Sequence, residues 1–154
     1  CALPICGIAS IEMLEAVGER WWPVFFRQLD GLLGKGGAAA LQVITIDDRR
    51  FEDYRRHPDF TQRYIFPGGM LPSPERLAAI AGECGLRLED PLFFGHSYAR
   101  TLGEWSTRFE GALADVFALG FDERFVRMWR YYLAYCKAGF SAGTIDVMQV
   151  RLET

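Results

Sequence analysis

Ser10-Ile11-Glu12-Met13-Leu14-Glu15-Ala16-Val17-Gly18 is the stretch that decides the fold. Its first two residues continue a predicted buried strand that begins at Ile8 and ends at Ile11. The strand turns into a loop with two carboxylates, and a helix follows. In an open α/β sheet, ligands bind outside the carboxyl ends of the strands. A glutamate just past such an end faces a ligand, so Glu15 is the first candidate for a functional residue.

A strand–helix–strand unit is predicted around this stretch. From Glu19 onward, apolar residues recur at spacings of three and four, which predicts a helix with a buried stripe of Trp22, Phe25, Phe26, Leu29, Leu32 and Leu33. The glycines at 34, 36 and 37 are predicted to end that helix. Residues 38–46 are mostly apolar and are predicted to be a strand buried on both faces. This unit implies a right-handed crossover and a parallel pair.

The rest of the chain alternates between further helices and strands. Ser73 and Pro74 are predicted to open a helix as its N-cap and first residue. A strand over 86–94, two long helices with apolar stripes over 98–116 and 121–140, and a closing strand over 144–152 follow. Such stripes usually pack into a core, although these wide aromatic ones could also wall an apolar channel.

The charged block over 47–63 has two interpretations. The first is a solvated loop or helix face. The second is that its arginines meet anionic lipid headgroups, an attraction of ~1 kcal/mol for each basic residue. The acidic residues interleaved with the arginines weaken the second interpretation.

Length and composition limit the class of protein. The 154 residues, with a net charge of −3, suit one domain and give no signal for nucleic acid. The sequence has no apolar run long enough to span a bilayer, so any lipid contact is expected to be peripheral. Residues 1–7 are interpreted as a non-native scar. Cys84 and Cys136 would then be the native cysteines, too few for a disulfide framework or a metal cluster, and typical of a reducing compartment.

Five groups of residues carry a family resemblance. They are Ser10 to Gly18, Thr45-Ile46, Tyr64 to Gly69 with Leu71-Pro72-Ser73, Tyr98 to Leu102 with Trp105 and Arg108-Phe109, and Met128 to Leu133. In this order the set resembles the cyclopropane-fatty-acyl-phospholipid synthases, including the mycolic acid cyclopropane synthases. The resemblance implies an α/β fold in which residues 8–154 are the C-terminal half of a class I S-adenosylmethionine-dependent methyltransferase sheet, Rossmann-like, with helical lid insertions.

The resemblance also implies a reaction. The enzymes of this family transfer a methylene group from S-adenosylmethionine to a cis double bond of an unsaturated phospholipid acyl chain. The alkene attacks the sulfonium methyl, a carbocation forms, and a bound bicarbonate removes a proton as the ring closes. A cation in an apolar tunnel needs a nearby anion, because low dielectric strengthens their attraction.

Four positions match the family's site residues. Glu15 matches the bicarbonate-site glutamate, although a helix N-terminal carboxylate would look the same. Tyr98 matches the site tyrosine, whose phenol donates to the anion, although it also fits a helix stripe. Ile46 matches a position whose backbone contributes. Cys136 matches a cysteine near the active site, although a lone cysteine on an apolar stripe is usually a small core hydrophobe.

The chain also departs from the family pattern. Family members often carry His where this chain has Ala16 and Ile44, and the second change removes an expected anion ligand. Gln42 shares a strand face with Ile44, so one hypothesis is that its amide replaces the histidine in binding bicarbonate. The alternative is that Gln42 meets only backbone or water. The glycine-rich loop for S-adenosylmethionine belongs before residue 8, so the chain is expected to hold no cofactor-binding residues, to have no metal site and to be inactive alone.

Two other functions stay open. One is a related S-adenosylmethionine methyltransferase that modifies an amine, or a fatty acid without ring formation. The other is a non-catalytic lipid-binding module. For the parent enzyme we expect a cytoplasmic location with peripheral contact at the inner face of the membrane, and a homodimer is compatible with the resemblance.

Overall fold

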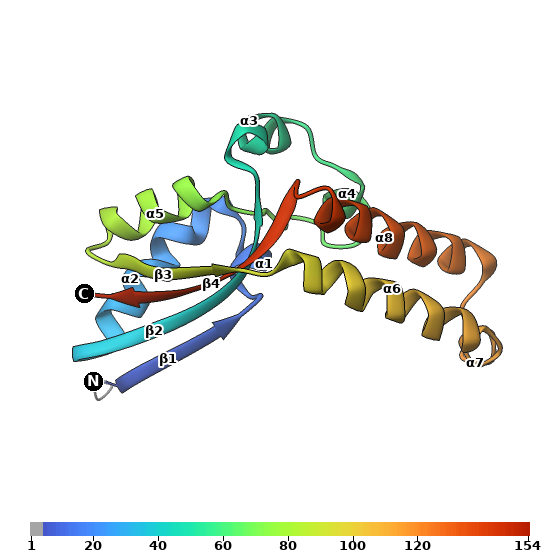
Figure 1. Cartoon of the computed structure of the whole chain (residues 1–154), viewed down its shortest axis with the longest axis horizontal. Coiled ribbons are helices and arrows are strands. Elements are labelled where there is room, and N and C mark those ends of the chain that lie inside the picture. The colour runs from blue at the N-terminus through green and yellow to red at the C-terminus, as the bar shows by residue number, and fades with distance from the viewer. Residues whose placement is uncertain (1–4) are drawn as a thin grey trace.

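A computed structural model describes residues 5–154 and contains a four-stranded mixed sheet in the order β1-β2-β4-β3 (Figure 1). The strands are β1 (Ile5–Ile11), β2 (Leu33–Ile46), β3 (Arg87–Phe93) and β4 (Ile145–Glu153). β1 and β2 run parallel, and β4 lies antiparallel between β2 and β3. The predicted parallel pair and the predicted closing strand are therefore confirmed.

The four predicted helices occur in the predicted order, and the structure adds shorter ones before and between them. The helices are α1 (Leu14–Val17), the 3₁₀ turn η1 (Glu19–Trp21), α2 (Trp22–Leu32), α3 (Asp48–Arg56), α4 (Phe60–Tyr64), α5 (Pro74–Glu83), α6 (Gly95–Gly111), α7 (Leu113–Ala118) and α8 (Glu123–Ser141). Ser73 caps α5 as predicted, because its Oγ accepts a hydrogen bond from the Arg76 backbone N–H at 3.3 Å. Among residues 5–154, none of these helices has both the length and the hydropathy that crossing a bilayer requires.

β1 is an edge strand, and the prediction that it would be buried is wrong. Most of its residues are exposed, including Ile11 at 68%. The reason is that β2 is its sole strand partner within the described part of the chain. Ile5 to Gly7, which fall in the stretch interpreted as a scar, form the first part of this strand. Residues 1–4 of that stretch lie outside the described residues, and the origin of the stretch stays a prediction.

β2 begins five residues earlier than predicted, and its glycines lie inside the strand. A Cβ on Gly37 would lie 2.9 Å from the Gly34 carbonyl oxygen and 3.1 Å from that of Ile5, so this position lets β1 approach closely. The sequence of a glycine run does not distinguish a helix end from a strand segment that a neighbouring strand approaches closely. β2 is also buried on one face rather than on both: Leu41 and Val43 are buried, whereas Ala40 is exposed.

The buried face of the sheet packs against α2 and α5. Trp22 and Phe26 of α2 and Leu77 and Ile80 of α5 are at most 1% exposed, and they share one core cluster with the buried residues of β2 and β4. The predicted stripe of α2 is confirmed at Trp22, Phe26 and Leu29, but Leu33 belongs to β2. This cluster anchors the end of β1 and the turn that follows it.

A hairpin of two long helices, α6 and α8, extends away from the sheet, with α7 at its far end (Figure 1). Its core consists of Ala99, Leu102, Leu133 and Phe140, which pack with Val147 of β4. The predicted stripes are too long, because α6 ends at Gly111 and α8 begins only at Glu123. Trp105 and Phe121, which the stripes included, are 52% and 45% exposed.

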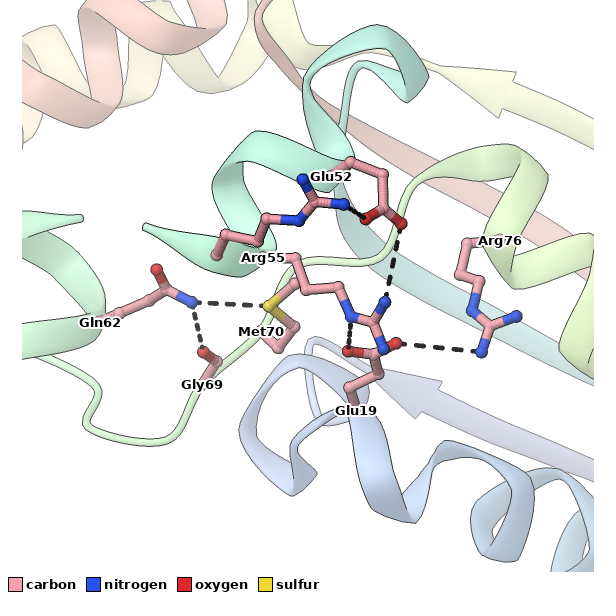
Figure 2. Close-up of polar contacts among 8 residues, drawn as sticks. Glu19, Glu52, Arg55, Gln62, Gly69, Met70 and Arg76 are labelled. Atoms are coloured by element: carbon pink, nitrogen blue, oxygen red, sulfur yellow. Dashed lines mark hydrogen bonds and ion pairs between the residues drawn. The ribbon is translucent and has the colours of Figure 1, made fainter. Parts of the chain in front are cut away.

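The charged block forms α3 and α4, and three of its arginines form ion pairs within the chain, namely Arg49, Arg55 and Arg56. Arg55 Nε lies 2.7 Å from Glu19 Oε2, and Glu19 also faces Arg76 of α5 at 3.9 Å (Figure 2). Gln62 of α4 donates to the Gly69 carbonyl oxygen at 3.1 Å. These contacts support the interpretation of a solvated helix face. The ion pairs hold α3 and α5 beside η1, and the Gln62 hydrogen bond closes the 57–72 segment on itself.

Gly95, the first residue of α6, should not tolerate a side chain. A Cβ there would lie 2.7 Å from Asp146 Oδ1 and 3.1 Å from a ring carbon of Phe140. We expect Gly95→Ala to lower the free energy of unfolding by about 1–3 kcal/mol, as overpacking usually does. Urea unfolding followed by circular dichroism measures this effect.

Gly82→Ala is the matched control for that prediction. Gly82 lies inside α5, and an added Cβ there meets nothing within 4 Å. Because alanine is the better helix former, this change should stabilise the chain by up to about 1 kcal/mol. Equal effects of the two substitutions would contradict the crowding that we assign to Gly95.

Candidate active site

The site lies where β1 ends and the chain turns into α1. Glu15 of α1 accepts a hydrogen bond from the Ile44 backbone N–H of β2, with 2.5 Å between N and Oε1. Its second oxygen, Oε2, is buried and has no hydrogen-bond partner among the described residues. Burial raises the pKa of Glu15, and the nearby charge of Glu12 contributes to the same rise. A buried carboxylate oxygen without a partner is costly, and no group within residues 5–154 offsets that cost by a hydrogen bond.

The backbone of α1 is held from two sides, which fixes where Glu15 points. Trp22 Nε1 donates to the Leu14 carbonyl oxygen at 3.2 Å. The Met70 backbone N–H donates to the carbonyl oxygen of Glu15 itself at 2.8 Å. The position of Glu15 therefore depends on the core through Trp22 and on the 57–72 segment through Met70.

A polar network joins the end of β1 to the hairpin and to β4. Tyr98 of α6 donates its phenolic proton to Glu12 Oε1. The Gln42 amide nitrogen lies 2.8 Å from the same Glu12 oxygen and 2.7 Å from the Tyr98 oxygen. Gln149 of β4 in turn donates to Gln42 Oε1 at 2.8 Å. The structure thus brings Tyr98 and Gln42, both candidates for the anion site, together around Glu12, which was not among the candidates.

Tyr98 remains protonated in this setting. Burial is the main cause that raises its pKa well above the ordinary range of a phenol, and the hydrogen bond to the Glu12 carboxylate adds to it. Its ring contacts the rings of Phe94 and Phe140, with centroids 5.9 and 5.4 Å away. Tyr98 therefore acts as a hydrogen-bond donor at the boundary between the polar network and the aromatic hairpin core.

Ile46 and Cys136 lie outside this hydrogen-bond network. The Ile46 backbone N–H donates to the Pro72 carbonyl oxygen at 3.0 Å, and its side chain belongs to the core. The backbone donor that reaches Glu15 is that of Ile44. Cys136 packs against the hairpin core beside Tyr132, and burial raises the pKa of its thiol to about 11. The thiol is thus protonated at neutral pH, and a direct chemical role for Cys136 stays a prediction.

A shallow hollow of about 410 Å³ adjoins the network on the uncovered face of the sheet. Its lining is mostly apolar and includes Ile11, Ala40 and Leu92, with Gln42 and Gln149 at the side of the network. The network therefore separates two apolar environments, the sheet face and the hairpin core.

The residues that sequence reasoning missed are Glu12 and Gln149. Glu12 lies inside the stretch that decides the fold, but the family resemblance points to Glu15. Its conformation, with φ of 51°, is rare for a residue other than glycine, and a sequence does not show it. Gln149 pairs with Gln42 across β2 and β4, a register that pattern alone does not give.

Comparison with known proteins identifies the family. The family model described as mycolic acid cyclopropane synthetase matches residues 4–150. The chain is 45% identical over 144 residues to the tuberculostearic acid methyltransferase UfaA1 of Mycobacterium tuberculosis, covering 93% of this chain and 34% of that protein. It is 36% identical over 143 residues to the cyclopropane-fatty-acyl-phospholipid synthase of Escherichia coli, covering 93% and 36%.

Solved structures agree with this assignment. The cyclopropane synthase MmaA2 from Mycobacterium tuberculosis superposes with a TM-score of 0.88 at 26% identity, over 100% of this chain and 57% of that one. The mycolic acid cyclopropane synthase CmaA1, in a complex with SAH and CTAB, gives the same values. The chain spans about a third of the length of the curated relatives named above. Because the family match covers the strand end, the hairpin and the closing strand alike, the chain belongs to the mycolic acid cyclopropane synthetase family and has the class I fold of the S-adenosylmethionine-dependent methyltransferases.

Proposed function

We propose that the protein containing this chain transfers a one-carbon group from S-adenosylmethionine to a cis double bond of an unsaturated phospholipid acyl chain. The observation that carries this proposal is the buried Glu15 Oε2, which has no hydrogen-bond partner among residues 5–154, on a carboxyl close enough to Tyr98 to help raise the pKa of its phenol. A carbocation is the kind of group that such a site stabilises, because a carboxylate in a poorly solvated place attracts a cation strongly.

Each part of the site has a task in this reaction. Glu15 supplies negative charge close to the cation, and a nearby positive charge favours its ionised form. Tyr98 stays protonated and orients the acceptor that faces it. The aromatic rings of Phe94, Tyr98 and Phe140 keep water from the cation and attract it through their faces.

S-adenosylmethionine would supply the methyl group, in keeping with the class I fold. Bicarbonate, which the family resemblance implies as the base, is a proposal that needs donors in this chain. Tyr98 donates its one proton to Glu12, and the Gln42 amide nitrogen is engaged by Glu12 and Tyr98. An external anion would therefore compete with Glu12 for both side chains.

A second candidate is methyl addition without ring closure. It is favoured by the 45% identity to a protein named as a tuberculostearic acid methyltransferase. The two candidates share every step up to the carbocation and differ in which bond forms as the proton leaves. The outcome is read from the product, because a cyclopropane ring contains no double bond, whereas methylation followed by proton loss retains one.

We also propose peripheral contact with a membrane through the far end of the hairpin. Phe117, Leu119 and Phe121 are 41%, 77% and 45% exposed there, around the turn between α7 and α8. Exposed aromatic and aliphatic side chains of this kind suit insertion at the boundary of headgroups and acyl chains. The inner-face location and the homodimer stay predictions.

The test uses the protein expressed from the longest coding sequence that contains this chain. It is incubated with radiolabelled S-adenosylmethionine and vesicles of an unsaturated phosphatidylcholine, and the fatty acids are analysed by mass spectrometry. We expect label in the lipid and a mass gain of one methylene on the unsaturated chain. Vesicles of a saturated phosphatidylcholine are the control and should take up no label. Cofactor consumption with no change in the lipid would point to another substrate, and lipid binding with no cofactor consumption would point to a binding module.

A further inference from the structure

Glu12 is held in a conformation that its residue type disfavours. It directly follows β1, with φ of 51°, and its backbone N–H donates to the Gln42 carbonyl oxygen at 2.8 Å. Residues other than glycine adopt this region at a conformational cost, and they cluster at functional sites. The turn at Glu12 brings its carboxylate over β2, to the side chains of Gln42 and Tyr98.

Glu12 is the common acceptor in this hydrogen-bond network. Gln149 fixes the carbonyl end of the Gln42 amide at 2.8 Å, so the nitrogen of that amide is directed at Glu12 and Tyr98. Tyr98 adds its phenolic donor. Donors collected in this way build an anion site, and the anion in it is the carboxylate of the chain itself.

A second anion in the same place would be unfavourable. It would need the donors that Glu12 already uses, and it would stand beside two carboxylates, since Glu12 is close enough for its charge to raise the pKa of Glu15. Like charges this close raise the free energy of the site. Bicarbonate is therefore not expected to bind to Tyr98 and Gln42 while the Glu12 carboxylate accepts their hydrogen bonds.

We propose that the Glu12 carboxylate takes the place of bicarbonate, as the anion beside the carbocation and as the base that removes the proton. This inference rests on the proposed function and names the base for it. Tyr98 and Gln42 both contact Oε1, so within the described residues Oε2 is the oxygen available to take the proton.

The reaction first forms a carbon–carbon bond and then transfers a proton to Glu12. The electron pair of the double bond forms a bond to the methyl carbon, and the carbon–sulfur bond breaks with its electrons moving to sulfur. The cation that remains on the chain loses a proton to Glu12. The electron pair of that C–H bond closes the ring, or forms a double bond where no ring closes. Glu12 is exposed in this chain, which gives the proton a path to water.

Two substitutions test the assignment in the longest coding sequence that contains this chain. Glu12→Gly removes the carboxylate and suits the backbone at φ of 51°, so its melting temperature should equal or exceed that of the unsubstituted protein. Glu12→Gln keeps the shape and an acceptor for Tyr98 but has no negative charge. Each protein is assayed on unsaturated lipid in buffer freed of carbon dioxide, then with added sodium bicarbonate, with sodium chloride as the ionic-strength control.

We expect the unsubstituted protein to turn over equally well with and without bicarbonate. Glu12→Gly should lose about 10²-fold in rate without bicarbonate and recover when it is added, because the vacated place then admits the anion. Glu12→Gln should stay slow in both buffers, because its amide fills that place. A bicarbonate requirement in the unsubstituted protein would overturn the inference, and so would full activity in Glu12→Gln, which would leave Glu12 as a positioning group for Tyr98. Absence of any methylated lipid from the unsubstituted protein in both buffers would instead overturn the proposed function.

Discussion

Glu15→Gln should lower the turnover number about 10²–10³-fold, the loss typical of removing one preorganised electrostatic group, without lowering the melting temperature at pH 7. Glutamine keeps an oxygen that accepts from the Ile44 backbone N–H, so the link to β2 remains. The negative charge beside the carbocation is lost. Lipid methylation assays and thermal melts of the same preparation measure the two effects.

The pH dependence of stability gives this prediction its sign. Burial raises the pKa of Glu15 in the folded state above its ordinary value of 4.5. At pH values between 4.5 and the raised pKa of the folded state, the folded state binds more protons than the unfolded state. The contribution of Glu15 to stability therefore falls as the pH rises through this range. Glu15→Gln removes that contribution. The variant should therefore melt at the same or a higher temperature than the unsubstituted protein at pH 7, and the difference should shrink toward pH 5.

Glu19→Gln is the matched control, four residues further along. It removes charge from the ion pairs with Arg55 and Arg76 and should leave turnover within about twofold. If the melting temperature of Glu15→Gln instead falls in step with its activity, Glu15 is a structural carboxylate at a helix start, the alternative that the sequence left open.

Periodicity was enough to predict the order of the long helices and the strands, because each long segment has the apolar spacing of its own structure, but not the short helices α3, α4 and α7. The stripe through Trp22, Phe26 and Leu29 located α2, and Ser73 with Pro74 located the start of α5. Exposure was harder to predict, because it depends on what lies beside a strand. The apolar residues of β1 look like a buried strand, but they form the edge of the sheet in the described chain.

The candidate site was predicted in part. Family resemblance located Glu15 and Tyr98, and the two-residue period of β2 placed Gln42 on the same face as Ile44. The direction of each hydrogen bond could not be predicted. Whether the Gln42 amide meets an external anion or Glu12 depends on the turn at Glu12 and on the register that brings Gln149 opposite. Both are tertiary features that no local pattern encodes.

Trp22→Ala should destabilise the protein by about 3–5 kcal/mol, the usual cost of emptying a large aromatic site in a core. Trp22 is fully buried, its ring centroid lies 6.5 Å from that of Phe51, and its Nε1 donates to the Leu14 carbonyl oxygen. Truncation leaves a cavity and takes the partner from that carbonyl. Since domains are stable by only about 5–15 kcal/mol, the variant should retain little stability. Urea unfolding followed by far-UV circular dichroism measures the change independently of the tryptophan signal.

Trp21→Ala is the control that separates burial from residue type. Trp21 is the neighbouring residue, yet it is 49% exposed, and the Arg20 guanidinium lies over its ring, 4.9 Å from the centroid. An exposed contact of this kind contributes about 0.5–1 kcal/mol, so Trp21→Ala should cost no more than that. Equal losses from the two substitutions would contradict the core that we assign to α2. A large loss at Trp22 alone would support the core that we assign to α2, to which the hydrogen bond from Trp22 ties the turn that carries Glu15.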